Sequence, residues 1–165
     1  MDNYKLSASL ATVAEYFKLG IQAGLIQPHA AIKWADSEIA ATELPADGVI
    51  EVAWSKSTAS VLDALLIVPG ERDRKLAGRW LLGLIIQPAI DSEESLQIAA
   101  KRALQVARDS ELGSEIYYQF DAIDDSISLA RSKTYGTLEQ CRVELVAALS
   151  EYSIQCPEFL SSMHL

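Results

Sequence analysis

The spacing of the apolar side chains constrains the fold most, because apolar residues recur every three or four positions through most of the chain. Residues three and four apart share one face of an α-helix, whereas successive residues of a strand alternate between two faces. The clearest apolar stripe consists of Ile116, Phe120, Ile123, Ile127 and Ala130. We therefore predict an all-α fold.

Helix-capping residues lie between the apolar stripes and predict where helices begin. Pro28 suits a first helical turn, where its missing N–H would have no partner. Two residue pairs have the spacing of a capping box, namely Asp91 with Glu94 and Thr137 with Gln140. These boundaries predict seven or eight helices joined by short connectors, arranged as a helical bundle or a short array of helical hairpins.

Two segments fit a helix less well than the rest of the chain. Residues 49–54 and 62–68 are rich in valine and isoleucine, which also suit buried strands. Their helical neighbours and their length still favour helices. We predict one helical domain over residues 1–152, followed by a C-terminal tail over residues 153–165.

The composition is that of a globular domain, and its charge narrows the classes of partner. The 165 residues, of which 50% are hydrophobic and 22% charged, suffice for a core without disulfides or metals. A formal charge of −9 disfavours nucleic acid and anionic membrane surfaces and favours a basic protein partner. Because neither a secretory signal pattern nor an apolar run of membrane-spanning length is present, we expect a cytoplasmic protein.

The strongest functional pattern is acidic. Residues 109–125 contain six carboxylates and no lysine or arginine. On the helix predicted there, carboxylates three residues apart are close enough to contact one cationic partner. This patch is a candidate protein-binding surface, although a solvated helix face gives the same pattern. Its candidate residues are Glu115, Tyr117, Asp121, Asp124 and Asp125.

A divalent metal is the alternative use of the same carboxylates. Asp121, Asp124 and Asp125 would then serve a helical enzyme or ligand carrier, but the other helices offer no matching ligand motif. Cys141 falls on a core stripe, and Cys156 lies in the tail without an evident activating base. We therefore predict no metal site, no cofactor and no catalytic residue.

Trp34 departs from the apolar stripe of its helix. If that helix is central, Trp34 is buried; if it is peripheral, Trp34 joins Asp36 and Glu38 on an exposed partner-binding face. Trp54 and Trp80 have aliphatic neighbours at core positions, so we predict that both are buried.

A basic cluster lies in the first turns of the helix predicted at residues 71–86. Arg72, Lys75 and Arg79 would share one helical face and form a candidate anion-binding site. The neighbouring Glu71 and Asp73 favour a salt-bridged surface helix instead.

The run at residues 32–40, together with Pro45 and residues 49–51, resembles a pattern of small bacterial all-helical proteins, some of which are similar to immunity proteins of toxin systems. The resemblance implies a non-enzymatic module that binds and inhibits another protein. Another hypothesis is a structural domain that forms a homodimer through an apolar surface at residues 81–90.

Overall fold

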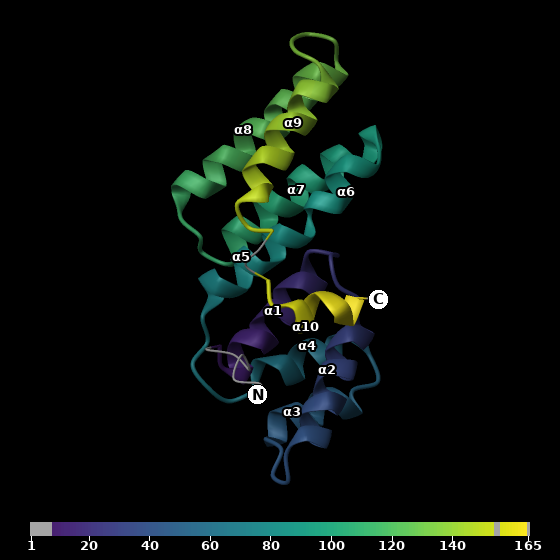
Figure 1. Cartoon of the computed structure of the whole chain (residues 1–165), viewed down its shortest axis with the longest axis vertical. Helices are drawn as coiled ribbons and strands as arrows, with labels where there is room; N and C mark the ends of the chain where they lie inside the picture. Colours follow the sequence, from purple (N-terminus) through teal and green to yellow (C-terminus); the bar gives the residue numbers. More distant parts are fainter. Residues whose placement is uncertain (1–7, 154–155, 165) are drawn as a thin grey trace.

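The computed structural model describes residues 8–153 and 156–164, and within these ranges the chain is helical and has no strand (Figure 1). The all-α prediction is confirmed. The described residues form ten α-helices, more than the predicted seven or eight, because the short helices α6 and α10 are added. The helices are α1 (Leu10–Gln22), α2 (Pro28–Ala41), α3 (Asp47–Trp54), α4 (Thr58–Leu66), α5 (Arg74–Leu84), α6 (Ile86–Asp91), α7 (Glu93–Asp109), α8 (Ser114–Arg131), α9 (Leu138–Ser150) and α10 (Glu158–Ser161), followed by the 3₁₀ turn η1 (Ser162–His164).

The helices form two groups that share one continuous hydrophobic core (Figure 1). In the N-terminal group, α1 packs against α2 and α4, and α3 closes the group by packing against the same two helices. In the C-terminal group, α7 packs against α6 and α8, and α9 contacts the same two helices. Helix α5 joins the groups because it contacts α1 on one side and α7 and α9 on the other.

Helix α1 is the centre of the N-terminal group. Every residue from Ala11 to Gly20 is buried, as expected of a helix that has neighbours on all sides. Its aromatic side chains Tyr16 and Phe17 lie at the centre of a cluster of rings. The ring of Tyr16 is 6.0 Å from that of Trp80 on α5, and the ring of Phe17 is 5.5 Å from that of Trp34 on α2. These contacts join three helices through one aromatic core.

Most predicted helix starts agree with the structure. Pro28 is the first residue of α2, and Thr137 and Gln140 form the predicted capping box of α9. The capping box assigned to Asp91 and Glu94 is wrong by one residue. Ser92 is the N-cap of α7, and its side chain accepts from the backbone N–H of Ser95, whereas Asp91 ends α6. The serine pair satisfies the backbone N–H groups of Ser92 and Ser95 at the start of α7.

Of the two segments that fit a helix less well, residues 49–54 belong to α3, and residues 62–66 form the second half of α4, which ends before residues 67 and 68. Gly48 explains why α3 lies close to the chain that follows α4. A Cβ atom at Gly48 would lie 2.8 Å from the backbone N and Cα of Val68, so a larger residue would push these segments apart. This close approach fixes the position of α3 beside α4.

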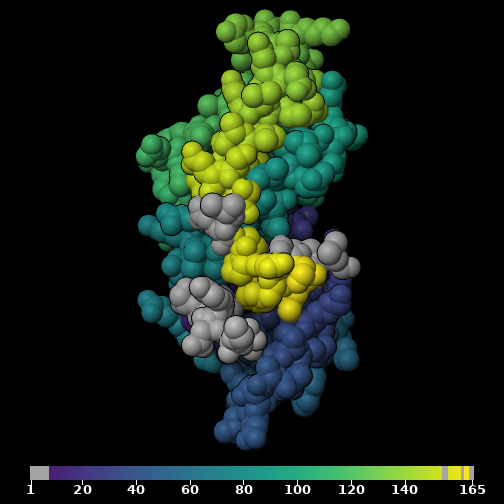
Figure 2. Space-filling view, in the orientation of Figure 1, coloured from purple at the N-terminus to yellow at the C-terminus, as the bar shows by residue number. Residues whose placement is uncertain are grey.

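The C-terminal tail returns to the N-terminal group, where Figure 2 shows α10 lying across the molecule. Leu160 is fully buried. Cys156 is hydrogen-bonded to the hydroxyl of Tyr16, and burial raises the pKa of its thiol to about 11. The tail predicted over residues 153–165 thus includes a helix that is part of the core; residues 154, 155 and 165 lie outside the described ranges.

Candidate functional site

Trp34 does not form an exposed anchor. Its side chain is 1% exposed, because α2 is covered by α1 on one side and by α3 on another. Asp36 is exposed and Glu38 is half-buried on the same helix. The prediction that Trp34 joins these carboxylates on a binding face is therefore wrong, and Trp34 is a core residue.

The acidic residues of α8 do not form one patch. Asp124 is half-buried and accepts a 2.9 Å hydrogen bond from Nε2 of Gln97 on α7. The oxygen of the same Gln97 amide accepts from Arg131 at 3.1 Å. Asp124 thus belongs to the polar contact between α7 and α8, whereas Glu115 and Asp125 are exposed.

The tyrosine predicted for the acidic patch lies in a separate depression at the start of α8. Tyr117 is half-buried and makes an edge-to-face contact with Tyr118, with 5.4 Å between the ring centroids. Arg108 and Glu111 also line this depression. Asp121, one turn further along α8, is half-buried and does not line it.

The metal alternative has no ligand cluster in the part of the chain that the structure describes. No three histidine, cysteine or carboxylate side chains in that part are arranged to hold a metal ion. The two thiols also lack activation. Burial raises the pKa of both Cys141 and Cys156, so the thiolate form is scarce at neutral pH.

The predicted anion site is not assembled, because α5 begins two residues after Arg72. Asp73 is the N-cap of α5, and its carboxylate accepts a 2.9 Å hydrogen bond from the N–H of Leu76. Arg72 therefore lies outside the helix and does not share a face with Lys75 and Arg79, which are exposed. The prediction of a common face is wrong.

Arg72 instead takes part in a buried ion cluster around Glu15 of α1. The carboxylate of Glu15 is fully buried; its Oε2 lies 2.8 Å from Nη1 of Arg72, and its Oε1 lies 2.8 Å from Nζ of Lys18. Arg74 Nε is 3.4 Å from Oε1. Burial by itself would raise the pKa of Glu15, but the adjacent cations Lys18 and Arg72 hold it below its ordinary value.

The guanidinium of Arg72 also caps the C-terminal end of α4. Its Nη2 donates to the carbonyl oxygens of Leu65 at 2.9 Å and Leu66 at 3.2 Å. These carbonyls belong to the last turn of the helix, where no intrahelical donor is available. A single side chain therefore connects α1 to the end of α4.

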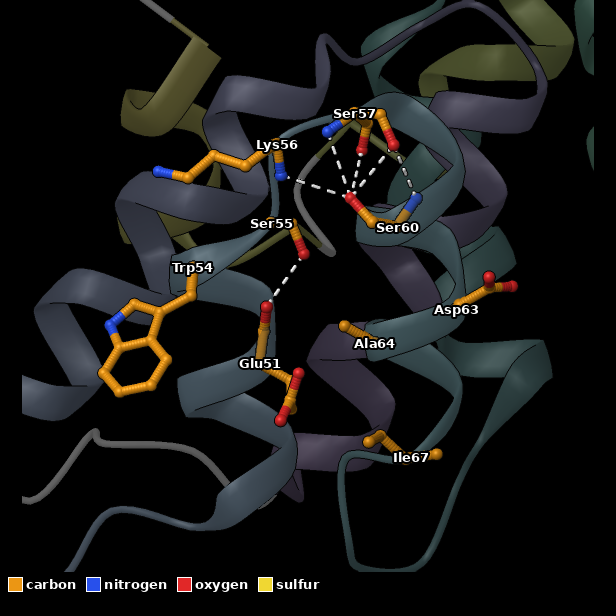
Figure 3. A pocket seen from close by; sticks show the side chains of 9 residues that line it. All are labelled: Glu51, Trp54, Ser55, Lys56, Ser57, Ser60, Asp63, Ala64 and Ile67. Carbon is orange, nitrogen blue, oxygen red and sulfur yellow. Dashed lines mark hydrogen bonds between the residues drawn. The ribbon is translucent and has the colours of Figure 1, made fainter.

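Trp54, at the end of α3, is one of several large apolar side chains that are exposed. Its side chain is 71% exposed, so the prediction that Trp54 is a core residue is wrong. It flanks an open groove of about 590 Å³ between α3 and α4, which we call the α3–α4 groove. The groove is lined by Glu51, Trp54, Ser55, Lys56, Ser57, Ser60, Asp63, Ala64 and Ile67 (Figure 3).

The side chains of the groove come from both helices. Figure 3 shows Glu51 and Ala64 between the helices, with Trp54 at the α3 side and Ile67 at the α4 side. Ile67 is 60% exposed. Asp63 is also on the α4 side, and neither it nor Glu51 takes part in an ion pair between described residues. The groove therefore combines exposed apolar surface with two carboxylates that form no ion pair within the described part of the chain.

The turn between α3 and α4 is held by a network of hydrogen bonds. Ser57 and Ser60 form a capping box in which each accepts from the backbone N–H of the other, at 3.1 and 3.0 Å. Ser55 Oγ donates to the carbonyl oxygen of Glu51 at 2.8 Å. These bonds satisfy the backbone at both helix ends, so Trp54 is presented from an ordered turn.

A sequence signal for the exposure of Trp54 does exist. The buried positions of α3 are Gly48, Val49 and Val52. Trp54 follows Val52 by two residues, which places it about 200° around the helix from that valine. Its aliphatic neighbours suggest a core position, but the helical phase indicates the opposite face.

Comparison of the chain with protein-family models, with curated proteins and with solved structures finds no match.

The apolar run at residues 81–90 is largely internal, because Leu81, Leu82, Ile85 and Ala89 are fully buried. Ile90, at its end, is 47% exposed. Leu84 and Ile86 of the same run are half-buried, and a homodimer through this surface stays a prediction. No helix in the described ranges has both the length and the apolar character needed to cross a bilayer.

Proposed function

We propose that this chain is a non-enzymatic protein-interaction module that binds a partner protein at the α3–α4 groove. The observation that carries the proposal is the 71% exposure of the Trp54 side chain beside that groove. Tryptophan is enriched among the residues that dominate protein–protein binding energy, because its large ring excludes water from a wide area.

The surroundings of Trp54 support a binding role. Leu66 and Ile67, at the end of α4, are 56% and 60% exposed. Ile67 lines the α3–α4 groove together with Trp54, so α3 and the residue after α4 each bring a large exposed apolar side chain to it. Large apolar side chains exposed around one groove favour an interaction site more than apolar residues scattered singly over the surface.

The charge of the chain favours a basic partner. A formal charge of −9 attracts a cationic protein over a distance and accelerates its association. The most specific form of the proposal is a toxin-neutralising immunity protein, which the resemblance at residues 32–40 supports. Under that form the partner is a basic toxin that loses its activity when the groove is occupied.

Site-specific photocrosslinking in the native host tests the proposal. A photoreactive amino acid is placed at Ile67, beside the groove, or at Tyr135, which is 78% exposed between α8 and α9. We expect a discrete protein adduct from position 67 that disappears when Trp54→Ala is added, and no such adduct from position 135. The same adduct from both positions, or one that is insensitive to Trp54→Ala, would contradict the proposal.

A further inference from the structure

We infer that the α3–α4 groove recognises an arginine of the partner, with the guanidinium stacked on Trp54 and paired with Glu51, and an adjacent aliphatic side chain of the partner placed against Ile67. This inference rests on the proposed function and names the chemistry of the partner segment. It commits the groove to a basic, partly apolar segment of another protein.

The position of Glu51 relative to Trp54 is the first argument. The two residues are three apart on α3, so their side chains are neighbours on the helix surface. An indole face attracts a cation through its quadrupole, and a carboxylate beside the ring adds a direct ion pair. A cation stacked on Trp54 is thus within reach of a second favourable interaction.

The charge balance of the groove is the second argument. Its charged lining residues are Glu51, Asp63 and Lys56, which sum to −1 from two negative charges and one positive charge. Neither carboxylate is in an ion pair between described residues. The ammonium of Lys56 extends along the Trp54 side of the groove and away from Asp63 (Figure 3). The groove therefore has negative charge available to a cationic ligand.

Arginine fits this arrangement better than lysine. Its planar guanidinium stacks flat on an aromatic ring and donates two parallel hydrogen bonds to a carboxylate, whereas an ammonium is a compact charge with a tightly held water shell. The shallow, open shape of the groove also favours a flat group over a deeply inserted one. The exposed side chain of Ile67 then covers the aliphatic neighbour of that arginine.

Titration with a synthetic peptide tests the inference without knowledge of the partner. The probe is an acetylated and amidated amphipathic peptide that carries arginine and leucine on one face. The matched probe has citrulline at each arginine position, which keeps the shape and removes the charge. The readout is the indole N–H resonance of each tryptophan, with the buried Trp34 and Trp80 as internal controls.

We expect the arginine peptide to shift the Trp54 resonance in a saturable manner and to leave the other two in place. The citrulline peptide should bind the unaltered chain about tenfold more weakly than the arginine peptide does. The double variant Glu51→Gln/Asp63→Asn should likewise bind the arginine peptide about tenfold more weakly than the unaltered chain does. Added salt should weaken binding of the arginine peptide more than that of the citrulline peptide, because only the first involves ion pairs.

Equal binding of the two peptides overturns the inference. If the Trp54→Ala variant loses its crosslinked partner while Glu51→Gln/Asp63→Asn retains it, the proposed function stands and the arginine inference is wrong. Sedimentation of the chain alone examines a second copy as the occupant. Self-association that Trp54→Ala abolishes would assign the groove to a homodimer and also overturn the inference.

Discussion

Nη1 of Arg72 lies 2.8 Å from Oε2 of Glu15, and this ion pair connects the central helix α1 to the end of α4. The same guanidinium holds the carbonyls of Leu65 and Leu66. Because Asp63, Ala64 and Ile67 form the α4 side of the groove, Arg72 positions one wall of the candidate binding surface. The pair is thus a positioning element for the groove.

Loss of either partner should destabilise the fold. Glu15→Gln leaves the cations Lys18 and Arg72 without their buried counter-charge. Arg72→Ala leaves the buried Glu15 carboxylate without one of its cationic partners. We expect each change to lower the free energy of unfolding by about 3 kcal/mol, measured by urea denaturation. The double variant should lose less than the sum of the two single variants. Glu144→Gln, at an exposed carboxylate of α9, is the control, and an equal effect there would contradict the role of the pair.

The Glu15 carboxylate should also make stability depend on pH in the acid range. Its pKa is lowered in the folded chain, so the unfolded chain binds more protons when the pH is below the ordinary value of 4.5. The stabilisation is therefore complete above that value and is lost as the pH falls through the folded pKa. Urea denaturation across this range should show a smaller loss for Glu15→Gln than for the unaltered chain. If the unfolding free energies of Glu15→Gln and of the unaltered chain fall equally as the pH is lowered, Glu15 does not contribute to the pH dependence of stability.

Trp34 and Trp54 should respond to substitution in opposite ways. Trp34→Ala removes a ring that is 1% exposed and should cost about 3–5 kcal/mol of unfolding free energy, since it leaves a cavity between α1 and α2. Trp54→Ala removes a ring that is 71% exposed and should change stability by less than about 0.5 kcal/mol. Chemical denaturation of both variants gives the comparison. A large cost for Trp54→Ala would indicate a structural role and weaken the case for the groove.

Docking of the tail should control the reactivity of Cys156. Because burial raises the pKa of this thiol to about 11, alkylation at neutral pH should be slow in the folded chain. Leu160→Ala removes a fully buried contact of α10 and should release the tail, which raises the alkylation rate of Cys156 at least about tenfold. Site-resolved mass spectrometry measures both thiols, and Cys141 in α9 is the internal control. Equal acceleration at both thiols would indicate global unfolding instead.

The all-helical class could be predicted from the sequence because apolar periodicity and capping residues are local signals. Pro28 and Thr137 begin their helices as expected, since a cap depends on a few neighbouring residues. The burial of Trp34 and Trp54 was harder to predict, because it depends on which other helices pack against their own. Trp34 lies off the main stripe of α2 yet is covered from two sides, and Trp54 has aliphatic neighbours yet is exposed.

The candidate sites were predicted least well. The predicted anion site was wrong because α5 begins later than its sequence pattern indicated. Placing that helix three residues too early put Arg72 on its face, whereas Asp73 caps the helix and leaves Arg72 free to reach Glu15. The partners are 57 residues apart, so no local pattern reveals the pair. The groove likewise depends on the packing of α3 against α4, which the spacing of residues within each helix does not specify.

The position of α5 between the two helical groups has a consequence for how the chain can be divided. Tyr16 of α1 is covered by Trp80 of α5, so the N-terminal group alone would expose its own central aromatic cluster to water. A fragment that ends before α5 should aggregate or remain unfolded when it is produced separately. Truncation or domain exchange at this junction is therefore unsuitable for locating the partner-binding activity, and only substitutions within the intact chain can do so.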